Sequence, residues 1–419
     1  MNKPKLLFLC NFSNALIRDR VVLRESKLRS LYFRIKHIKP HYGTDYAVWV
    51  SDYIEEFENH PEWEFHIVAP MQGLRNETQC FEERGIHYHF YNCSYNFVKT
   101  IANKVFNYEE GRDYPTIRKR IRSIAESISP ELVILCGAEN PFYSIGVLDV
   151  KKQPVYVILQ TLLNSPKRAS MGVGNDYKRK IEKAIFAHAN FFCTSDETEI
   201  SVIKENNEHA VILPAGFPTH NPDVVIPEEK DFDFVFFAKT IGKYKGIEDV
   251  LQALAIVKKN KKDVRLIIIG GLSDVYKEVL NEQVHNLGID NNVIFAGLYQ
   301  EIGDTYSNVV KANAAVLPGV TGSFNSTVRE SMLMGIPVIC YEFQETINVN
   351  ANKHCLLTAK MEDIDDLAKQ MLFTIENCEE TKHIAENGRD YALSHFGNAP
   401  IVNRLLKHCQ AIVEGKYGR

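Results

Sequence analysis

Few features of this 419-residue sequence point to a metal, a disulfide or a membrane span. Its nine cysteines are odd in number and include no CxxC pair, so the ligand spacing of zinc sites is missing. Several stand in or beside apolar segments, which is typical of reduced core thiols in a cytosolic protein. The apolar run at 6–10 is too short for a signal peptide, and no run reaches the roughly 18 apolar residues of a spanning helix. We therefore expect a cytoplasmic protein.

The sequence also has no excess of charge of one sign. Its 49 basic and 53 acidic residues leave a formal net charge of −4, which gives no reason to expect nucleic acid as a partner. Hydrophobic residues make up 45% and charged residues 24%, the balance of an ordinary globular protein. Because the chain is too long for one core, we expect two domains.

Short apolar segments alternate with amphipathic ones along nearly the whole chain. Buried strands rich in Val, Ile, Leu and Phe that alternate with helices predict parallel sheets covered on both faces. The strands expected in the first half are 5–10, 63–68, 87–91, 131–136, 155–159, 190–194 and 210–213, with helices at 46–59, 116–128 and 178–187. Those expected in the second half are 232–238, 265–270, 292–296, 314–317 and 337–341, with helices at 247–258, 275–287, 303–310 and 326–334.

A turn-rich stretch separates the two halves. Pro214-Ala215-Gly216-Phe217-Pro218 is followed by a polar, proline-bearing segment to Glu229, which is typical of a hinge. The predicted fold class is therefore α/β, with two doubly wound Rossmann-like domains facing across a cleft. In such sheets ligands bind at the carboxyl ends of the strands.

Two lysines stand at such a strand end. Lys239 ends the strand expected at 232–238, and Lys245 precedes Gly246 at a helix start. Because the N-terminus of a helix has a positive field of its own, two lysines beside it are explained by an anion between them. The alternative is that both are solvated loop lysines.

The segment 318–330 turns on two glycines from a strand into a helix. Backbone N–H groups at Asn325, Ser326 and Thr327 would form a cradle of the size of a phosphate, and Phe324, where the turn-helix begins, is expected to bind the same ligand. Glu330 lies about one helical turn further on the same face, where its carboxylate can accept both hydroxyls of a ribose. The alternative for Thr327 and Glu330, which are three residues apart, is a capping box.

Other segments of the second half narrow the choice of ligand. Gly297, Leu298 and Tyr299 follow the strand at 292–296, so their backbone is a candidate for reading the edge of a base, with a plain loop as the alternative. The segment 269–273 lacks the G-x-G-x-x-G spacing, which argues against an NAD-dependent dehydrogenase. No Asp-x-Asp stands at the carboxyl end of an expected strand in this half, so we expect no metal and no cofactor besides the substrate.

Three of these segments together resemble the family-4 retaining glycosyltransferases of the GT-B fold (glycosyl transferases group 1). That family has a basic pair about six residues apart before a glycine, and a Glu-Ala-Met-x-x-Gly-x-Pro-Val run. The segments that carry the resemblance are Lys239 to Gly246, 292–297 and Glu330-Ser331-Met332-Leu333-Met334-Gly335-Ile336-Pro337-Val338. The resemblance covers about 234–338, and the first half is similar only in outline.

The resemblance implies domains and site residues. The N-terminal domain, 1–218, would bind the acceptor and the C-terminal domain, 219–397, the nucleotide sugar, while the helix of 398–419 would cross back to the first domain. Lys239 and Lys245 would stabilise the diphosphate leaving group, Glu330 would bind the donor ribose, and Gly43 and Thr44 stand where the family has its N-terminal glycine loop. Gly322 replaces a glutamate of the family and Gln160 a histidine.

The function implied is transfer of a sugar from a UDP- or GDP-sugar to a hydroxyl of a glycan or lipid-linked acceptor. Such a hexosyltransferase would retain configuration, need no metal, and act in the synthesis of surface polysaccharides or glycoconjugates. The alternatives are a nucleotide-sugar epimerase of the same fold and a non-catalytic nucleotide-sugar-binding protein, which Gly322 and Gln160 favour.

A basic segment at 14–41 precedes Gly43. The segment contains only two acidic residues. Its basic residues are Arg18, Arg20, Arg24, Lys27, Arg29, Arg34, Lys36 and Lys39. The segment predicts peripheral contact with an anionic membrane surface or with the phosphate of a lipid-linked acceptor. The alternative is a solvated helix that covers the first sheet.

Overall fold

The computed structural model describes residues 3–24, 47–94, 111, 113–170, 172, 174–320 and 324–417. The chain folds as two compact units, one of Met1–Pro218 with Ile401–Arg419 and the other of Thr219–Pro400. Gly43, Thr44, Gly322 and most of the basic segment 14–41 lie outside the described residues. No helix in the described ranges combines the length and apolar character needed to cross a membrane.

The sheet of the first unit has the strand order β3-β4-β2-β1-β5-β6-β7-β8 among the described residues. Its strands are parallel apart from β3, which pairs antiparallel with β4. The bounds are β1 Lys5–Leu9, β2 Glu64–Met71, β3 Thr78–Glu83, β4 Ile86–Asn92, β5 Leu132–Cys136, β6 Val155–Ile158, β7 Phe191–Cys193 and β8 Val211–Ile212. The sequence pattern does not predict β3, because this exposed edge strand holds only Phe81 and Cys80 as apolar residues.

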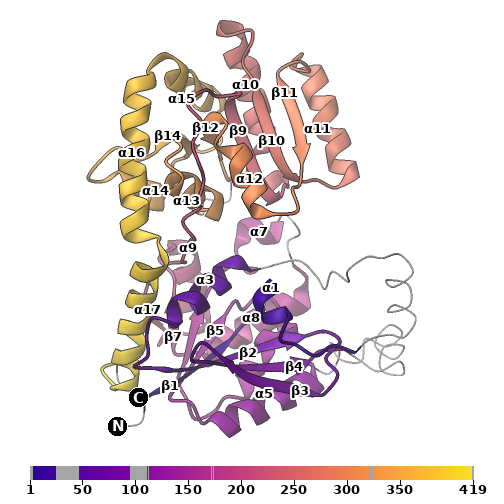
Figure 1. Cartoon of the computed structure of the whole chain (residues 1–419), viewed down its shortest axis with the longest axis vertical. Coiled ribbons are helices and arrows are strands. Elements are labelled where there is room, and N and C mark those ends of the chain that lie inside the picture. Colours follow the sequence, from indigo (N-terminus) through magenta and orange to yellow (C-terminus); the bar gives the residue numbers. More distant parts are fainter. Residues whose placement is uncertain are drawn as a thin grey trace. The chain divides into compact units, whose positions relative to one another are not determined.

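Helices cover both faces of this sheet (Figure 1). Alternate residues of β1 enter two different cores, Leu6 and Phe8 one and Leu7 and Leu9 the other. The second core receives α5, whose buried isoleucines recur at helical spacing, and the first receives α17. The helices are α1 Ala15–Arg18, α3 Val48–Phe57, α5 Pro115–Ile128, α6 Pro141–Ser144, η2 Ile145–Asp149, α7 Pro166–Ser170, α8 Asp176–His188, α9 Glu197–Asn206 and α17 Asn398–Val413.

The sheet of the second unit is parallel, with the order β11-β10-β9-β12-β13-β14 among the described residues. Residues 233–238 of β9 are all buried, as expected for a strand covered on both faces. The strands are β9 Phe232–Thr240, β10 Leu266–Gly271, β11 Val293–Gly297, β12 Ala312–Val316, β13 Val338–Tyr341 and β14 Leu357–Ala359. The helices are η3 Lys243–Lys245, α10 Ile247–Asn260, α11 Asp274–Asn286, α12 Ile302–Val309, α13 Ser326–Leu333, α14 Gln344–Asn350, α15 Ile364–Glu376 and α16 Cys378–His395.

Each sheet reverses its strand order at one position. In the first unit β2, β3 and β4 lie on one side of β1, and the later strands, from β5 to β8, lie on its other side. In the second unit β10 and β11 lie on one side of β9, and β12, β13 and β14 lie on its other side. Loops at the carboxyl ends of such neighbouring strands diverge and leave a crevice for a ligand. The prediction of two doubly wound α/β units is thus confirmed, and each unit offers one such position.

The Asp-x-Asp at the start of β9 has a structural use. Asp233 is buried and accepts hydrogen bonds from Lys261 Nζ at 2.7 Å and from the Arg265 backbone N–H at 2.8 Å. Asp363, in the other Asp-x-Asp, caps α15 by accepting from the Asp366 N–H at 3.0 Å. Asp233 thus lies near the start of β9, whereas Asp363 stands at the start of α15, in the loop that follows β14.

Candidate functional site

The loops that follow β9 and β12 are packed tightly at the switch point of the second unit. Gly246 has a φ of +76°, and a Cβ at that position would lie 2.2 Å from the carbonyl oxygen of Pro318. The Val320 N–H donates to the Tyr244 carbonyl at 3.2 Å. Only glycine allows this approach, so the lysine-bearing turn 243–245 is held against the loop that leads to α13.

Lys245 contacts the start of α13. Its Nζ donates to Oδ1 of Asn325 at 3.4 Å and lies 5.4 Å from the centre of the Tyr244 ring. Gly246 ends the turn and α10 begins at Ile247, as the sequence predicts. Lys239 lies near the end of β9 and is exposed. The structure therefore joins Lys245 to the predicted phosphate cradle, and the role of both lysines stays a prediction.

The first turn of α13 differs in one respect from the cradle expected. Asn325 is the N-cap of the helix, and the next backbone N–H groups, at Ser326 and Thr327, have no partner within a helix. The Phe324 N–H, however, donates to Oε2 of Glu345 on α14 at 3.0 Å. No motif signalled Glu345, because the contact joins two segments that are separated by the strand β13.

Glu330 is held by hydroxyl groups. Burial of its carboxyl raises its pKa above the ordinary value, while the charges of Arg329 and Lys245 and hydrogen bonds from the hydroxyls of Ser326 and Tyr306 lower it. A carboxylate in such a setting is suited to accept further hydroxyl donors. Tyr306 belongs to α12, a helix that carries no motif, so nothing in the sequence pattern predicted its role.

The capping-box alternative for Glu330 is wrong. The N-cap of α13 is Asn325, which places Val328 at the third helical position, so Thr327 cannot be the N-cap of such a box. The carboxyl of Glu330 points instead to the hydroxyl of Ser326, one turn earlier. The residue thus lies on the predicted face of the helix.

The predicted base-reading loop lies at the end of β11. Gly297 has a φ of +76°, Leu298 is 54% exposed, and Tyr299 packs in part against the core. Gly271, at the end of β10, lies between this loop and the first: a Cβ there would be 3.7 Å from Leu298 Cδ2 and 3.1 Å from the Lys239 carbonyl. The loops after β9, β10 and β11 therefore meet at one edge of the sheet.

The first unit shows less of its predicted site. Gln160 is exposed in the loop after β6. Of the basic residues on α5, Arg118 forms a two-point ion pair with Asp149, both contacts at 2.8 Å, and Arg120 contacts the Asn92 carbonyl. Both cations are therefore bound within the fold.

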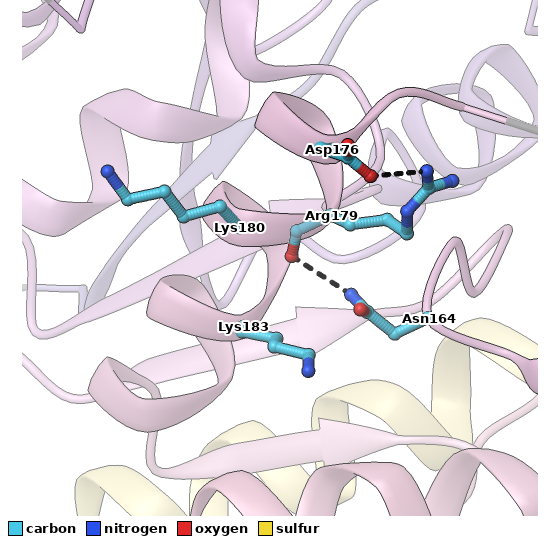
Figure 2. A pocket seen from close by; sticks show the side chains of 5 residues that line it. All are labelled: Asn164, Asp176, Arg179, Lys180 and Lys183. Carbon is cyan, nitrogen blue, oxygen red and sulfur yellow. Dashed lines mark hydrogen bonds and ion pairs between the residues drawn. The ribbon is translucent and has the colours of Figure 1, made fainter. Parts of the chain in front are cut away.

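A surface hollow of about 390 Å³ lies beside α8 (Figure 2). Asn164 Nδ2 donates to the Arg179 carbonyl at 3.0 Å, and the Arg179 side chain pairs with Asp176 at 2.8 Å. Figure 2 shows that the side chains of Lys180 and Lys183 leave the helix in different directions. Since the cations do not converge, we assign this hollow no ligand.

Comparisons with known proteins bear on the fold of the chain and on the family of its second unit. Residues 221–391 match the family model of glycosyl transferases group 1. Among curated proteins, none matches the chain. Among solved structures, sucrose-phosphate synthase from Thermosynechococcus elongatus shares 13% identity at a TM-score of 0.67, over 99% of this chain and 100% of that one.

Two further structures extend this likeness. Anabaena HepE in complex with UDP and glucose shares 14% identity at a TM-score of 0.63, over 97% of this chain and 100% of its own. A glycosyltransferase from Rickettsia africae shares 14% identity at a TM-score of 0.60, over 99% of each chain. The chain thus has the two-domain α/β fold of GT-B glycosyltransferases, and its second unit carries a glycosyl transferases group 1 domain.

Proposed function

We propose that this protein is a hexosyltransferase that moves a sugar from a UDP- or GDP-sugar to a hydroxyl of a glycan or lipid-linked acceptor. The observation that carries the proposal is the contact of Lys245 with Asn325 at the switch point of the second unit, one turn from Glu330. A cation beside a helix N-terminus is suited to bind a diphosphate, and a carboxylate that already accepts hydrogen bonds from hydroxyl groups is suited to bind a ribose. The UDP bound by HepE is consistent with this choice of ligand.

In the proposed reaction the bond between the sugar C1 and the β-phosphate oxygen breaks, and a bond from C1 to the acceptor oxygen forms. The acceptor proton passes to the leaving phosphate. Negative charge develops on that phosphate, so Lys239, Lys245 and the N–H groups of Ser326 and Thr327 would stabilise it in place of a metal ion. Glu330 would hold the ribose, and Gly297, Leu298 and Tyr299 would contact the base. We propose retention of configuration, without a metal, in polysaccharide or glycoconjugate synthesis.

A panel of UDP-, GDP- and ADP-sugars tests the proposal. A donor at about 100 times its dissociation constant adds roughly 2.7 kcal/mol to the stability of the unit that binds it, which raises Tm by about 5–10 °C. Release of the nucleoside diphosphate, measured with and without EDTA, then tests transfer and metal independence. A donor that stabilises the protein without any turnover would favour the binding-protein alternative, and epimerised donor would favour the epimerase.

A further inference from the structure

Glu139 lies at the position of the first unit where its sheet changes direction. It stands in the short connection from β5 to α6, beyond the carboxyl end of β5. Since β5 is the neighbour of β1 at the switch point, this connection borders the crevice in which open α/β sheets bind ligands. Lys245 and Asn325 hold the equivalent place in the second unit.

The turn that carries Glu139 is hydrogen-bonded and leaves space for its carboxyl group. Gly137 has a φ of +90°, and a Cβ there would lie 2.8 Å from Oε2 and 2.9 Å from Oε1 of Glu139. The Tyr143 hydroxyl donates to the Cys136 carbonyl at 2.8 Å, and the Ser144 hydroxyl donates to the Ala138 carbonyl at 3.1 Å. The carboxyl thus lies over Gly137, in a turn whose carbonyls at Cys136 and Ala138 accept side-chain hydrogen bonds.

One oxygen of the carboxyl is not satisfied. Oε2 of Glu139 is buried and has no hydrogen-bond partner in the part of the chain that the structure describes. Burial, together with the charge of Glu182, raises the pKa of this carboxyl to about 7, although a hydrogen bond from the Glu139 backbone N–H and the charges of Lys178 and Arg168 lower it. Its neighbours Tyr143 and Cys136 are both buried. The group is therefore partly ionised near neutral pH.

Glu182, on α8, shows how this chain treats a buried carboxyl that serves the fold. Its Oε1 accepts the Leu163 N–H at 3.0 Å, while Oε2 accepts the Asn164 N–H at 2.9 Å and Asn164 Nδ2 at 2.7 Å. These bonds fix the loop after β6. A buried oxygen without a partner lowers stability, so Glu139 contributes nothing comparable to the fold.

We propose that Glu139 binds a hydroxyl group of the sugar acceptor, which donates its hydrogen bond to Oε2. The inference rests on the proposed glycosyl transfer and names a residue of the first unit that would orient the acceptor. A hydroxyl donor supplies the partner that Oε2 lacks, and Arg168 and Lys178 favour the ionised carboxylate that accepts it.

A first test needs no acceptor. Glu139→Gln keeps the shape of the side chain and removes a buried charge, so we expect a Tm equal to or above that of the wild type at pH 8. In the matched control, Glu182→Gln, an amide group faces N–H donors, and Tm should fall by several degrees. A fall of that size in Glu139→Gln would show that its carboxyl supports the fold, and would overturn the proposal.

A second test measures turnover, with water, glycerol and glucose as hydroxyl probes and the donor that stabilises the protein most. We expect Glu139→Gln to release nucleoside diphosphate at least tenfold more slowly, with an unchanged Kd for UDP. The wild-type rate should fall as pH drops below about 7, and the variant should lose this dependence. Equal rates and equal pH profiles, with UDP bound by both proteins, would overturn the role of Glu139 alone. A wild-type protein that binds no nucleotide sugar would overturn the proposed function and, with it, this inference.

Discussion

The ammonium nitrogen of Lys245 lies 3.4 Å from the side-chain oxygen of Asn325, a residue 80 positions away in the sequence. The contact exists because β9 and β12 are neighbours in the sheet although β10 and β11 separate them along the chain. It places a cation at the N-terminus of a helix, a position that is electrostatically unfavourable without an anion. The contact is therefore consistent with the anion site that we propose.

Replacing Lys245 should separate chemistry from folding. A charged hydrogen bond contributes about 1.5–3 kcal/mol, so we expect Lys245→Ala to lower kcat/KM for the nucleotide sugar by about 10- to 150-fold. Lys243→Ala, which removes an exposed cation of the same turn, is the matched control and should leave kcat/KM within about twofold. Thermal unfolding of both variants should resemble that of the wild type. A Lys245→Ala protein with wild-type turnover would contradict the assignment.

Glu345 should compete with the diphosphate. Its carboxylate accepts the N–H of Phe324, one residue before the N-cap of α13, and so places a negative charge beside the predicted phosphate cradle. We expect Glu345→Gln, which keeps a side-chain oxygen for that N–H, to lower the Kd for UDP by several-fold. Isothermal titration at low and high salt measures the effect, which should shrink as salt screens the charge. A Kd that rises instead would mean that Glu345 supports nucleotide binding.

Much of this site could be predicted from the sequence, because its parts lie at strand ends. The apolar segments before Lys239 and Gly297 mark strands, and the glycines of 318–330 mark the turn into α13. Parallel strands bring such ends to one edge of a sheet, so local patterns were sufficient to group these residues.

The contacts that other helices make with Glu330 and Phe324 could not be predicted from the sequence. Tyr306 and Glu345 reach Glu330 and Phe324 from helices without motifs, and only the three-dimensional packing brings them there. Glu139 gave no signal either, since a single glutamate after an apolar strand has no distinguishing spacing. The strand β3 was missed for a related reason: it is an exposed edge whose pairing with β4 depends on the partner strand more than on its own residues.

Gly246 should be essential for the packing of the two loops. Alanine at this position would have a positive φ and a Cβ 2.2 Å from the backbone of Pro318, so we expect Gly246→Ala to destabilise the second unit by about 2–4 kcal/mol. Gly303→Ala, in the helix α12 with no atom within 4 Å of the new Cβ, should be neutral or stabilising by up to about 1 kcal/mol. Urea unfolding measures both. Equal midpoints for the two variants would show that the loops can separate at little cost.

A histidine cluster should make the first unit sensitive to acid. His66 Nδ1 and His89 Nε2 are 3.0 Å apart, the His87 ring stacks on His66, and Cys80 Sγ lies 3.3 Å from His89 Nδ1. Burial and the charges of His66 and His87 together lower the pKa of His89 to about 4; burial also lowers the pKa of His66.

The sign of the effect follows from these shifts. In the unfolded chain both imidazoles take up a proton near pH 6.5, whereas in the folded chain they resist protonation until lower pH. The unfolded state therefore binds more protons between about pH 6.5 and pH 4, and the free energy of unfolding falls as pH falls through this range. His89→Gln, whose amide gains no charge, should make this dependence shallower, while His285→Gln, which changes an exposed histidine, should not. Urea unfolding from about pH 7 to about pH 4 compares the three proteins. Parallel pH profiles for wild type and His89→Gln would mean that the cluster accepts protons in the folded state as readily as in the unfolded chain.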